Sequence, residues 1–253
     1  MISWCKTRLI NYIFDSKLRR HVDHASNYDA MYAAESRYIE ETGRTHLEER
    51  GFDGKLYQQL LASLRRVLSR AGQEPNSILE IGAGSGYLAL RLGDPTTIVH
   101  LVDRSSAACE LARRLAVLLH KQDQTVIHEF DLFTWRPPRL FDVALSIGLY
   151  EELDDQCQKR FVRLVIDSVR PGGIVIIGVP NFWSPAMLSI WKQHGKADER
   201  YVPRDSLRRA LRKAGLRQVK SISGGAVTYS PDCTLADHLL PWLKMIHFAW
   251  GIR

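Results

Sequence analysis

Residues 78–88 read Ile-Leu-Glu-Ile-Gly-Ala-Gly-Ser-Gly-Tyr-Leu, an apolar run that breaks into glycines and then resumes. This pattern predicts a strand, a tight turn and a helix that begins near Ser85. Glycine lacks a Cβ and tolerates positive φ, so the main chain at Gly82, Gly84 and Gly86 can turn sharply and lie close to a ligand. The helix would direct its first N–H groups at that ligand. A glycine turn also serves as a plain connector, so both interpretations stay open at this point.

The composition indicates a globular protein with one large core. Of the 253 residues, 45% are hydrophobic, and no apolar run is long enough to span a bilayer. The apolar and aromatic stretch at residues 1–14 is interrupted by Lys6 and Arg8, and it lacks a secretory cleavage site. The four cysteines lie far apart without a Cys-x-x-Cys pair, which argues against a disulfide framework and a zinc site. We therefore predict a cytoplasmic protein without a bound metal.

The formal net charge is +7, which favours an acidic or phosphorylated partner, or an anionic membrane surface. A solvated basic surface explains the same charge. Much of the excess falls at the three-to-four residue spacing of one helix face. The residues concerned are Arg204, Arg208, Arg209, Arg212, Lys213, Arg217 and Lys220.

Strand and helix patterns alternate along the chain. Strands are predicted at 97–103, 125–130, 141–146 and 174–179, helices at 54–70, 105–120 and 155–169, a turn at 170–173, and a closing pair of strands at 216–222 and 226–229. The alternation predicts an α/β protein with a parallel, doubly wound sheet. Right-handed crossovers then place the carboxyl end of each parallel strand on the same edge as the glycine turn.

The chain divides into three predicted parts. Residues 1–53 form a helical lid or substrate region, residues 54–233 form the core with an aromatic-rich insertion at 180–203, and residues 234–253 form an apolar helix. The apolar and tryptophan-bearing termini are suited to a membrane interface. Packing on each other, on the core or on a second subunit, as in a homodimer, is the favoured alternative.

Two aspartates identify the class of ligand. The glycines follow the spacing Gly-x-Gly-x-Gly, whereas a dinucleotide fingerprint requires Gly-x-Gly-x-x-Gly. Asp103 ends the next strand, about twenty residues beyond the glycines, where a carboxylate accepts hydrogen bonds from ribose hydroxyls. Asp131 follows the third strand and is placed to accept from an exocyclic amine such as that of adenine. The sequence therefore predicts a nucleoside ligand at this edge of the sheet.

These residues carry a resemblance to a known family. The segments Glu80–Gly86, Asp103, Asp131-Leu132, Phe141–Leu153 and Arg170–Gly173 resemble, in this order, the motifs of class I S-adenosylmethionine-dependent methyltransferases. The similarity covers residues 54–222 and is greatest to small-molecule enzymes of the ubiquinone and menaquinone biosynthesis type. It implies a Rossmann-like sheet of seven strands in the order 3-2-1-4-5-7-6, mostly parallel with one antiparallel strand, between an N-terminal helical lid and a C-terminal helical tail.

The resemblance also implies roles for single residues. S-adenosylmethionine would be the cofactor, with the glycines beneath its amino-acid portion and Glu80 orienting the glycine turn. Asp103 would hold the ribose with Arg104 beside it, and Asp131 and Leu132 would hold the adenine. Ser146 and Gly148 would line the methionine end.

Methyl transfer from a sulfonium needs mainly an acceptor held in line, about 3 Å away, in a dry pocket. A hydroxyl acceptor also needs a base. The candidate bases are Glu151, Glu152, His24, His46 and His194, and the candidate substrate walls are Tyr28, Tyr32, Tyr150, Phe182, Trp183 and Trp191. These aromatic residues suit a flat or apolar acceptor that is methylated on oxygen, nitrogen or carbon.

Two other functions remain open from the sequence. The basic helix favours a nucleic-acid methyltransferase acting on RNA, although the fourth strand runs into Ser146–Tyr150 without the Asn/Asp-Pro-Pro-aromatic turn that grips a flipped base. A binding module that holds the cofactor without catalysis is the second alternative.

Overall fold

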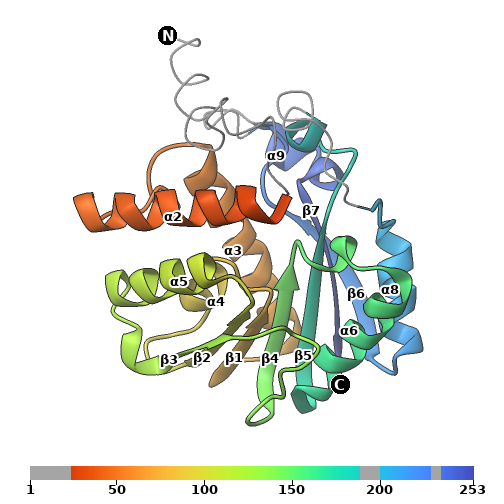
Figure 1. The fold of residues 1–253 in the computed structure, drawn as a ribbon. Helices are drawn as coiled ribbons and strands as arrows, with labels where there is room; N and C mark the ends of the chain where they lie inside the picture. The colour runs from red at the N-terminus through yellow and green to blue at the C-terminus, as the bar shows by residue number, and fades with distance from the viewer. Residues whose placement is uncertain (1–23, 189–199, 229–234) are drawn as a thin grey trace.

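The computed structural model describes residues 24–188, 200–228 and 235–253, with the main chain alone at residues 24–27 and 52. One sheet of seven strands organises this part of the chain, in the order β3-β2-β1-β4-β5-β7-β6 (Figure 1). The strands are β1 Ser77–Ile81, β2 Ile98–Asp103, β3 Thr125–Glu129, β4 Phe141–Ile147, β5 Val169–Pro180, β6 Arg217–Gly224 and β7 Ile246–Ile252. β7 runs antiparallel to both of its neighbours, and the other pairs are parallel. The predicted order and the single antiparallel strand are confirmed.

Helices cover both faces of the sheet. The α-helices are α2 His24–Thr42, α3 Phe52–Ala71, α4 Tyr87–Leu92, α5 Ser106–Leu118, α6 Asp155–Asp167, α8 Arg204–Lys213 and α9 Leu235–Leu239, with short 3-10 turns at η2 Gln122–Gln124, η3 Tyr150–Glu152 and η4 Pro241–Leu243. Successive strand side chains point to opposite faces, so Ile78 packs with α3, α4 and α5, whereas Leu79 packs with α6 and α8. Every residue of β1 is buried, as the central strand of a two-sided sheet requires.

Helix ends form where the sequence supplies caps. Ser105 accepts a hydrogen bond from the Ala108 N–H at the start of α5, and the Asp154 side chain accepts from two N–H groups at the start of α6. Gly72 ends α3 in the left-handed conformation, at φ 64°. α2 lies across the carboxyl edge of the sheet, over α5 (Figure 1). None of the described helices is long and apolar enough to cross a membrane.

The C-terminal segment differs from the prediction. The helix predicted for residues 234–253 is confirmed only in α9, and Ile246–Ile252 forms β7 between β5 and β6. This segment has the alternation of a strand: Phe248 and Trp250 enter the layer of α3, whereas Ala249 enters the layer of α6. A strand in this position pairs its backbone groups on both sides, which a helix could not do. β7 therefore takes the place predicted for a strand at 226–229, of which residues 226–228 form no strand.

The turn predicted at residues 170–173 is also wrong, because the chain does not reverse its direction there. Phe141 pairs with Val169 and Val143 pairs with Ile174, so the extra residues bulge from β5 and the strand continues through them. Gly172 takes a φ of 84° within this bulge, a conformation that favours glycine. The Arg170 side chain turns back to the Asp142 carboxylate, which also accepts hydrogen bonds from the Asn76 and Ser77 N–H groups.

A buried ion pair anchors α3 to the C-terminal segment. Lys55 Nζ lies 2.9 Å from Asp237 Oδ2, and the two side chains are 9% and 2% exposed. Gln59 Nε2 donates to the same oxygen at 2.8 Å, and the Val227 N–H donates to Asp237 Oδ1 at 2.6 Å. The Asp237 carboxylate therefore replaces its lost hydration with three partners, two from α3 and one from the segment after β6.

We predict that Asp237→Ala lowers the free energy of unfolding by roughly 3–5 kcal/mol, because it leaves the Lys55 charge buried without its carboxylate. Urea denaturation followed by circular dichroism measures the loss. The matched control is Asp167→Ala, which breaks the exposed Arg163–Asp167 pair and should cost less than about 1 kcal/mol. Equal losses in the two variants would contradict this account of the Lys55–Asp237 pair.

Candidate active site

Three positions of the loop between β1 and α4 require glycine for steric reasons. Gly82, Gly84 and Gly86 have φ values of 66°, 52° and 66°, which residues with a Cβ rarely adopt. A Cβ at Gly82 would lie 2.6 Å from Leu149 Cδ2, and one at Gly86 would lie 2.3 Å from Leu101 Cδ1. The Gly82 and Ala83 N–H groups both donate to the Val102 carbonyl, at 2.9 and 3.1 Å. The loop is therefore held against the end of β2.

Asp103 connects this loop to the next helix. It ends β2, where Oδ2 accepts a hydrogen bond from the Gly84 N–H at 2.8 Å and Oδ1 accepts one from the Ser105 N–H at 2.9 Å. The side chain is half-buried and Arg104 beside it is exposed. The Asp103 carboxylate thus sits at the carboxyl edge of the sheet, as predicted from its place in the sequence.

Glu80 supports the loop from below. Its side chain is buried, and Oε2 accepts a hydrogen bond from the Ala89 N–H of α4 at 3.2 Å. Burial raises the pKa of the Glu80 carboxyl to about 8, with a small further rise from the charge of Asp103. The carboxyl is therefore mostly protonated at neutral pH, and it fixes α4 relative to β1.

The tyrosines of α2 lie over the loop. A Cβ at Gly84 would lie 2.7 Å from Tyr32 Oη, so this phenol occupies the space that the glycine leaves. Tyr28 stacks on Tyr32 with ring centroids 6.3 Å apart. Burial, followed by the charge of Asp103, raises the pKa of Tyr32 well above its usual value. Tyr28 and Tyr32 lie four residues apart on α2, and Tyr32 reaches the glycine loop.

A cavity of about 310 Å³ opens between α2, α3 and the glycine loop. We call it the lid cavity. Its lining includes Tyr32, Tyr57, Asp53, Glu35 and His46, together with the apolar side chains of Met31, Leu47, Leu56, Leu60, Leu88, Leu111, Ile147 and Ile246. Burial, followed by the charge of Glu35, raises the pKa of Asp53 to about 6. The lid cavity is therefore apolar over most of its wall and acidic at one end.

The sequence singled out Tyr32 and His46 in this cavity but missed Glu35, Asp53, Leu56 and Tyr57. The sequence predicts a helix at 54–70 but does not show which side chains of its first turns face a ligand. Asp53 and Tyr57 lie four residues apart, on one face at the start of α3. The sequence signal for these cavity residues is an acidic residue and a tyrosine on the apolar face of a helix.

The residues predicted to contact the adenine and the methionine end of the cofactor lie along the same edge of the sheet. Asp131 is exposed after β3, where its Oδ1 accepts a hydrogen bond from the Phe133 N–H at 2.8 Å, and Leu132 is half-buried. Ser146 is buried in β4, and Gly148 follows β4 with a φ of 81°. In the sheet, β3 is the neighbour of β2, which ends in Asp103, and β4 is the neighbour of β1, which leads into the glycine loop. The predicted residues therefore follow strands that adjoin these two.

The predicted bases and substrate walls are scattered. Glu151 is buried in η3, and its carbonyl accepts a hydrogen bond from the Arg200 N–H at 3.1 Å. Tyr150 packs near Phe161 on the α6 side of the sheet, Phe182 lies beside the Tyr201 ring, and Trp183 is 69% exposed. These four residues do not line the lid cavity. The His24 side chain, Trp191 and His194 lie outside the described residues.

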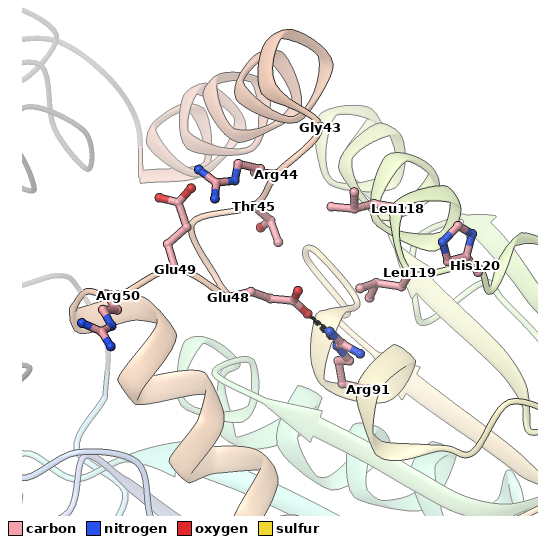
Figure 2. A pocket seen from close by; sticks show the side chains of 10 residues that line it. All are labelled: Gly43, Arg44, Thr45, Glu48, Glu49, Arg50, Arg91, Leu118, Leu119 and His120. Atoms are coloured by element: carbon pink, nitrogen blue, oxygen red, sulfur yellow. Dashed lines mark hydrogen bonds and ion pairs between the residues drawn. The ribbon is translucent and has the colours of Figure 1, made fainter.

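A second, more open hollow of about 750 Å³ lies on the other side of the α2–α3 connection (Figure 2). Figure 2 shows Arg44, Glu49 and Arg50 at its rim, and an ion pair between Glu48 and Arg91 on its floor. Its lining contains no residue of the glycine loop. Its three arginines face two glutamates, so most of its charge is compensated within the hollow, and we assign it no ligand.

Comparisons with known proteins relate the chain to methyltransferases. Residues 52–221 match a family model described as a methyltransferase domain. A malonyl-[acyl-carrier protein] O-methyltransferase of Geobacter sulfurreducens is 28% identical over 195 residues, which cover 70% of this chain and 71% of that protein.

Solved structures share the fold at low identity. An O-methyltransferase family protein from Burkholderia thailandensis gives a TM-score of 0.58 at 14% identity, covering 91% of this chain and 60% of its own. The N-methyltransferase NodS from Bradyrhizobium japonicum, solved in complex with S-adenosyl-L-homocysteine, gives 0.54 at 15% identity, covering 86% of this chain and 97% of its own. The chain thus spans less than two thirds of the Burkholderia protein.

We predict that Glu80 makes stability depend on pH. Its folded pKa, about 8, lies above the unfolded value of 4.5, so its contribution is fully present below pH 4.5 and is lost as pH rises to 8. The slope for one such group is at most about 1.4 kcal/mol per pH unit. Glu80→Gln removes this slope, so its stability relative to the parent should rise between pH 5 and 8.

Urea denaturation at four pH values in that range measures the difference. Glu129→Gln, at the exposed end of β3, is the matched control and should keep a constant difference from the parent. Parallel stability curves for the parent and Glu80→Gln would show that burial does not hold this carboxyl protonated.

Proposed function

The chain belongs to the methyltransferase domain family, and we propose that it transfers the methyl group of S-adenosylmethionine to a small molecule with a flat or apolar body. The observation that carries this proposal is the lid cavity, where apolar side chains and three tyrosines meet the glycine loop. A pocket of this kind buries an apolar ligand and fixes it through few polar groups. The wall composition supports a small acceptor, methylated on oxygen, nitrogen or carbon.

The residues present fit the cofactor. Side chains at Gly82 and Gly86 would collide with Leu149 and Leu101, and a side chain at Gly84 would collide with Tyr32. The loop is therefore closed against its protein neighbours, and Gly82, Ala83 and Gly84 form a cradle of main chain along the lid cavity. We propose that this cradle takes the amino-acid portion of the cofactor, supported by Glu80. The remaining proposed contacts are Asp103 and Arg104 at the ribose, Asp131 and Leu132 at the adenine, and Ser146 and Gly148 at the methionine end.

When bound, the cofactor supplies a methyl group already activated on a sulfonium. The protein then has to exclude water and hold the acceptor in line. Tyr32 covers the loop from α2, and Tyr57 closes the lid cavity from α3. We retain Tyr28 as a wall candidate because it stacks on Tyr32. Glu151 stays a candidate base beyond β4, together with His24 and His194, and Tyr150, Phe182, Trp183 and Trp191 stay candidate walls.

The placement of the basic helix argues against the nucleic-acid alternative. Leu207 and Leu211 of α8 pack in the layer of α6, whereas residues of α2 and α3 line the lid cavity. Figure 1 shows α8 beside α6, away from α2. The arginines of α8 therefore do not border the cavity. The relative from Geobacter sulfurreducens bears an acyl-carrier substrate in its name, which supports a small or carrier-tethered acceptor for this chain.

Exposed apolar side chains support a finer proposal on partners. Leu235, Leu239 and Trp242, on α9 and η4, are 67%, 62% and 57% exposed. They favour peripheral contact with a membrane or contact between two copies of the chain. Liposome flotation tests the first, and sedimentation velocity tests the second. The cytoplasmic location stays a prediction.

We predict that Asp103→Ala weakens the binding of S-adenosylhomocysteine roughly 10- to 100-fold, since the ribose would lose a charged acceptor and Gly84 its tie to β2. Isothermal titration calorimetry measures the affinity, and circular dichroism confirms the fold. Asp205→Asn, on the exposed side of α8, is the control and should bind like the parent. Unchanged affinity in Asp103→Ala would contradict the proposed ribose site.

With methyl-labelled cofactor, we predict label transfer to small phenols, amines or carboxylic acids with an aromatic or alicyclic body. Total RNA serves as the competing acceptor in the same assay. Because the lid cavity is narrow and apolar, RNA should remain unlabelled. Label in RNA alone would instead support the nucleic-acid alternative.

A further inference from the structure

A carboxylate and an imidazole form a fixed pair at the wall of the lid cavity. Glu35 Oε2 lies 2.9 Å from His46 Nδ1. Glu35 Oε1 accepts hydrogen bonds from Thr45 Oγ1 at 2.6 Å and from the His46 N–H at 3.0 Å. The Glu35 side chain is 8% exposed and that of His46 is 28% exposed. Glu35 is thereby positioned by three contacts, and it in turn positions the His46 ring.

The ring is also held from its face. The Tyr38 and His46 rings lie 3.7 Å apart between centroids. The Tyr38 hydroxyl donates to Glu49 Oε1 at 2.6 Å, which fixes the tyrosine. When the Glu35 carboxylate accepts a hydrogen bond from His46 Nδ1–H, the neutral ring carries its lone pair on Nε2. A carboxylate that sets the tautomer and orientation of an imidazole is the arrangement by which proteins prepare a general base.

Both residues of the pair line the cavity that the glycine loop also lines. Asp53 of α3 lines the same cavity, and its carboxyl group interacts electrostatically with Glu35 and His46. The titratable groups near His46 thus include Glu35 and Tyr38 from α2 and Asp53 from α3.

We propose that His46 is the general base of the methyl transfer and that Glu35 is its positioning residue. The inference rests on the proposed function. The acceptor O–H or N–H gives its proton to His46 Nε2 as the new bond from oxygen or nitrogen to the methyl carbon forms. The S–CH₃ bond breaks, and its electron pair stays on sulfur as the neutral thioether. The imidazolium, paired with Glu35, later releases its proton to water.

The contacts of Glu35 would also tie the α2–α3 connection to α2 without any role in catalysis. In that case His46 need not lie near the transferred methyl group, and its loss would lower stability alone. The test must therefore report on position and on proton transfer separately.

The first measurement concerns position and needs no acceptor. S-adenosylmethionine labelled with ¹³C in the transferred methyl group is bound to the protein, and isotope-filtered nuclear Overhauser contacts are recorded. We expect contacts between the methyl protons and the His46 ring protons, absent in His46→Gln. His120→Gln, which removes an exposed histidine beyond α5, should leave them unchanged.

The second measurement concerns proton transfer, with an acceptor that the labelling assay identifies. General base removal predicts that His46→Ala loses roughly 100- to 10,000-fold in kcat, while the KM for the cofactor changes little. Added imidazole should restore part of the kcat of His46→Ala. Glu35→Gln should lose less kcat than His46→Ala, and His120→Gln should match the parent.

The outcomes separate the two proposals. If calorimetry detects no binding of S-adenosylmethionine, the proposed function fails and the role of His46 fails with it. If the cofactor binds but its methyl group contacts other residues and not His46, the inference about His46 alone is overturned. Loss of stability in His46→Ala without rescue by imidazole would likewise assign the pair a structural role.

Discussion

The structure depends on one steric constraint, the absence of side chains where the chain leaves β1. At Gly82 and Gly86 a Cβ would overlap the Leu149 and Leu101 side chains, so the loop closes against its neighbours only with glycine. The positive φ values turn the chain within a few residues and aim α4 back along the sheet. Asp103 and Glu80 fix this loop from the side and from below through hydrogen bonds to the Gly84 and Ala89 N–H groups. Bare main chain is thereby presented at the carboxyl edge, where open α/β sheets bind ligands.

The remainder of the site is assembled around this loop by elements that are distant in the sequence. α2 places Tyr32 against Gly84, and α3 places Tyr57 and Asp53 in the same cavity. Burial raises the pKa of Glu80 and of Asp53, because a carboxylate in an apolar cavity loses its hydration. The pair of Glu35 and His46 keeps its polar atoms in mutual contact instead. The lid cavity therefore combines an apolar wall with a few oriented polar groups.

The opposite end of the sheet shows how packing overrides local pattern. The apolar composition of the C-terminal segment suits a helix or a strand, and the vacant position between β5 and β6 decides between them. In that position β7 buries Phe248 and Trp250 and pairs its backbone on both sides. The burial of one large aromatic side chain contributes roughly 1.5–3 kcal/mol. The Lys55–Asp237 pair then joins the segment before β7 to α3, and so to the lid cavity.

Local spacing in the sequence determined the glycine loop, the place of Asp103, the alternation of strands and helices in the parallel part and the caps of α5 and α6. These features depend on neighbouring residues and on the few topologies that a twisted parallel sheet allows. Tertiary structure alone decided that Ile246–Ile252 is a strand, that Tyr150 turns toward α6, and that Glu35, His46 and Asp53 share one cavity with the loop. Such contacts join residues far apart in the chain, and no periodicity or spacing encodes which helix face will meet which loop.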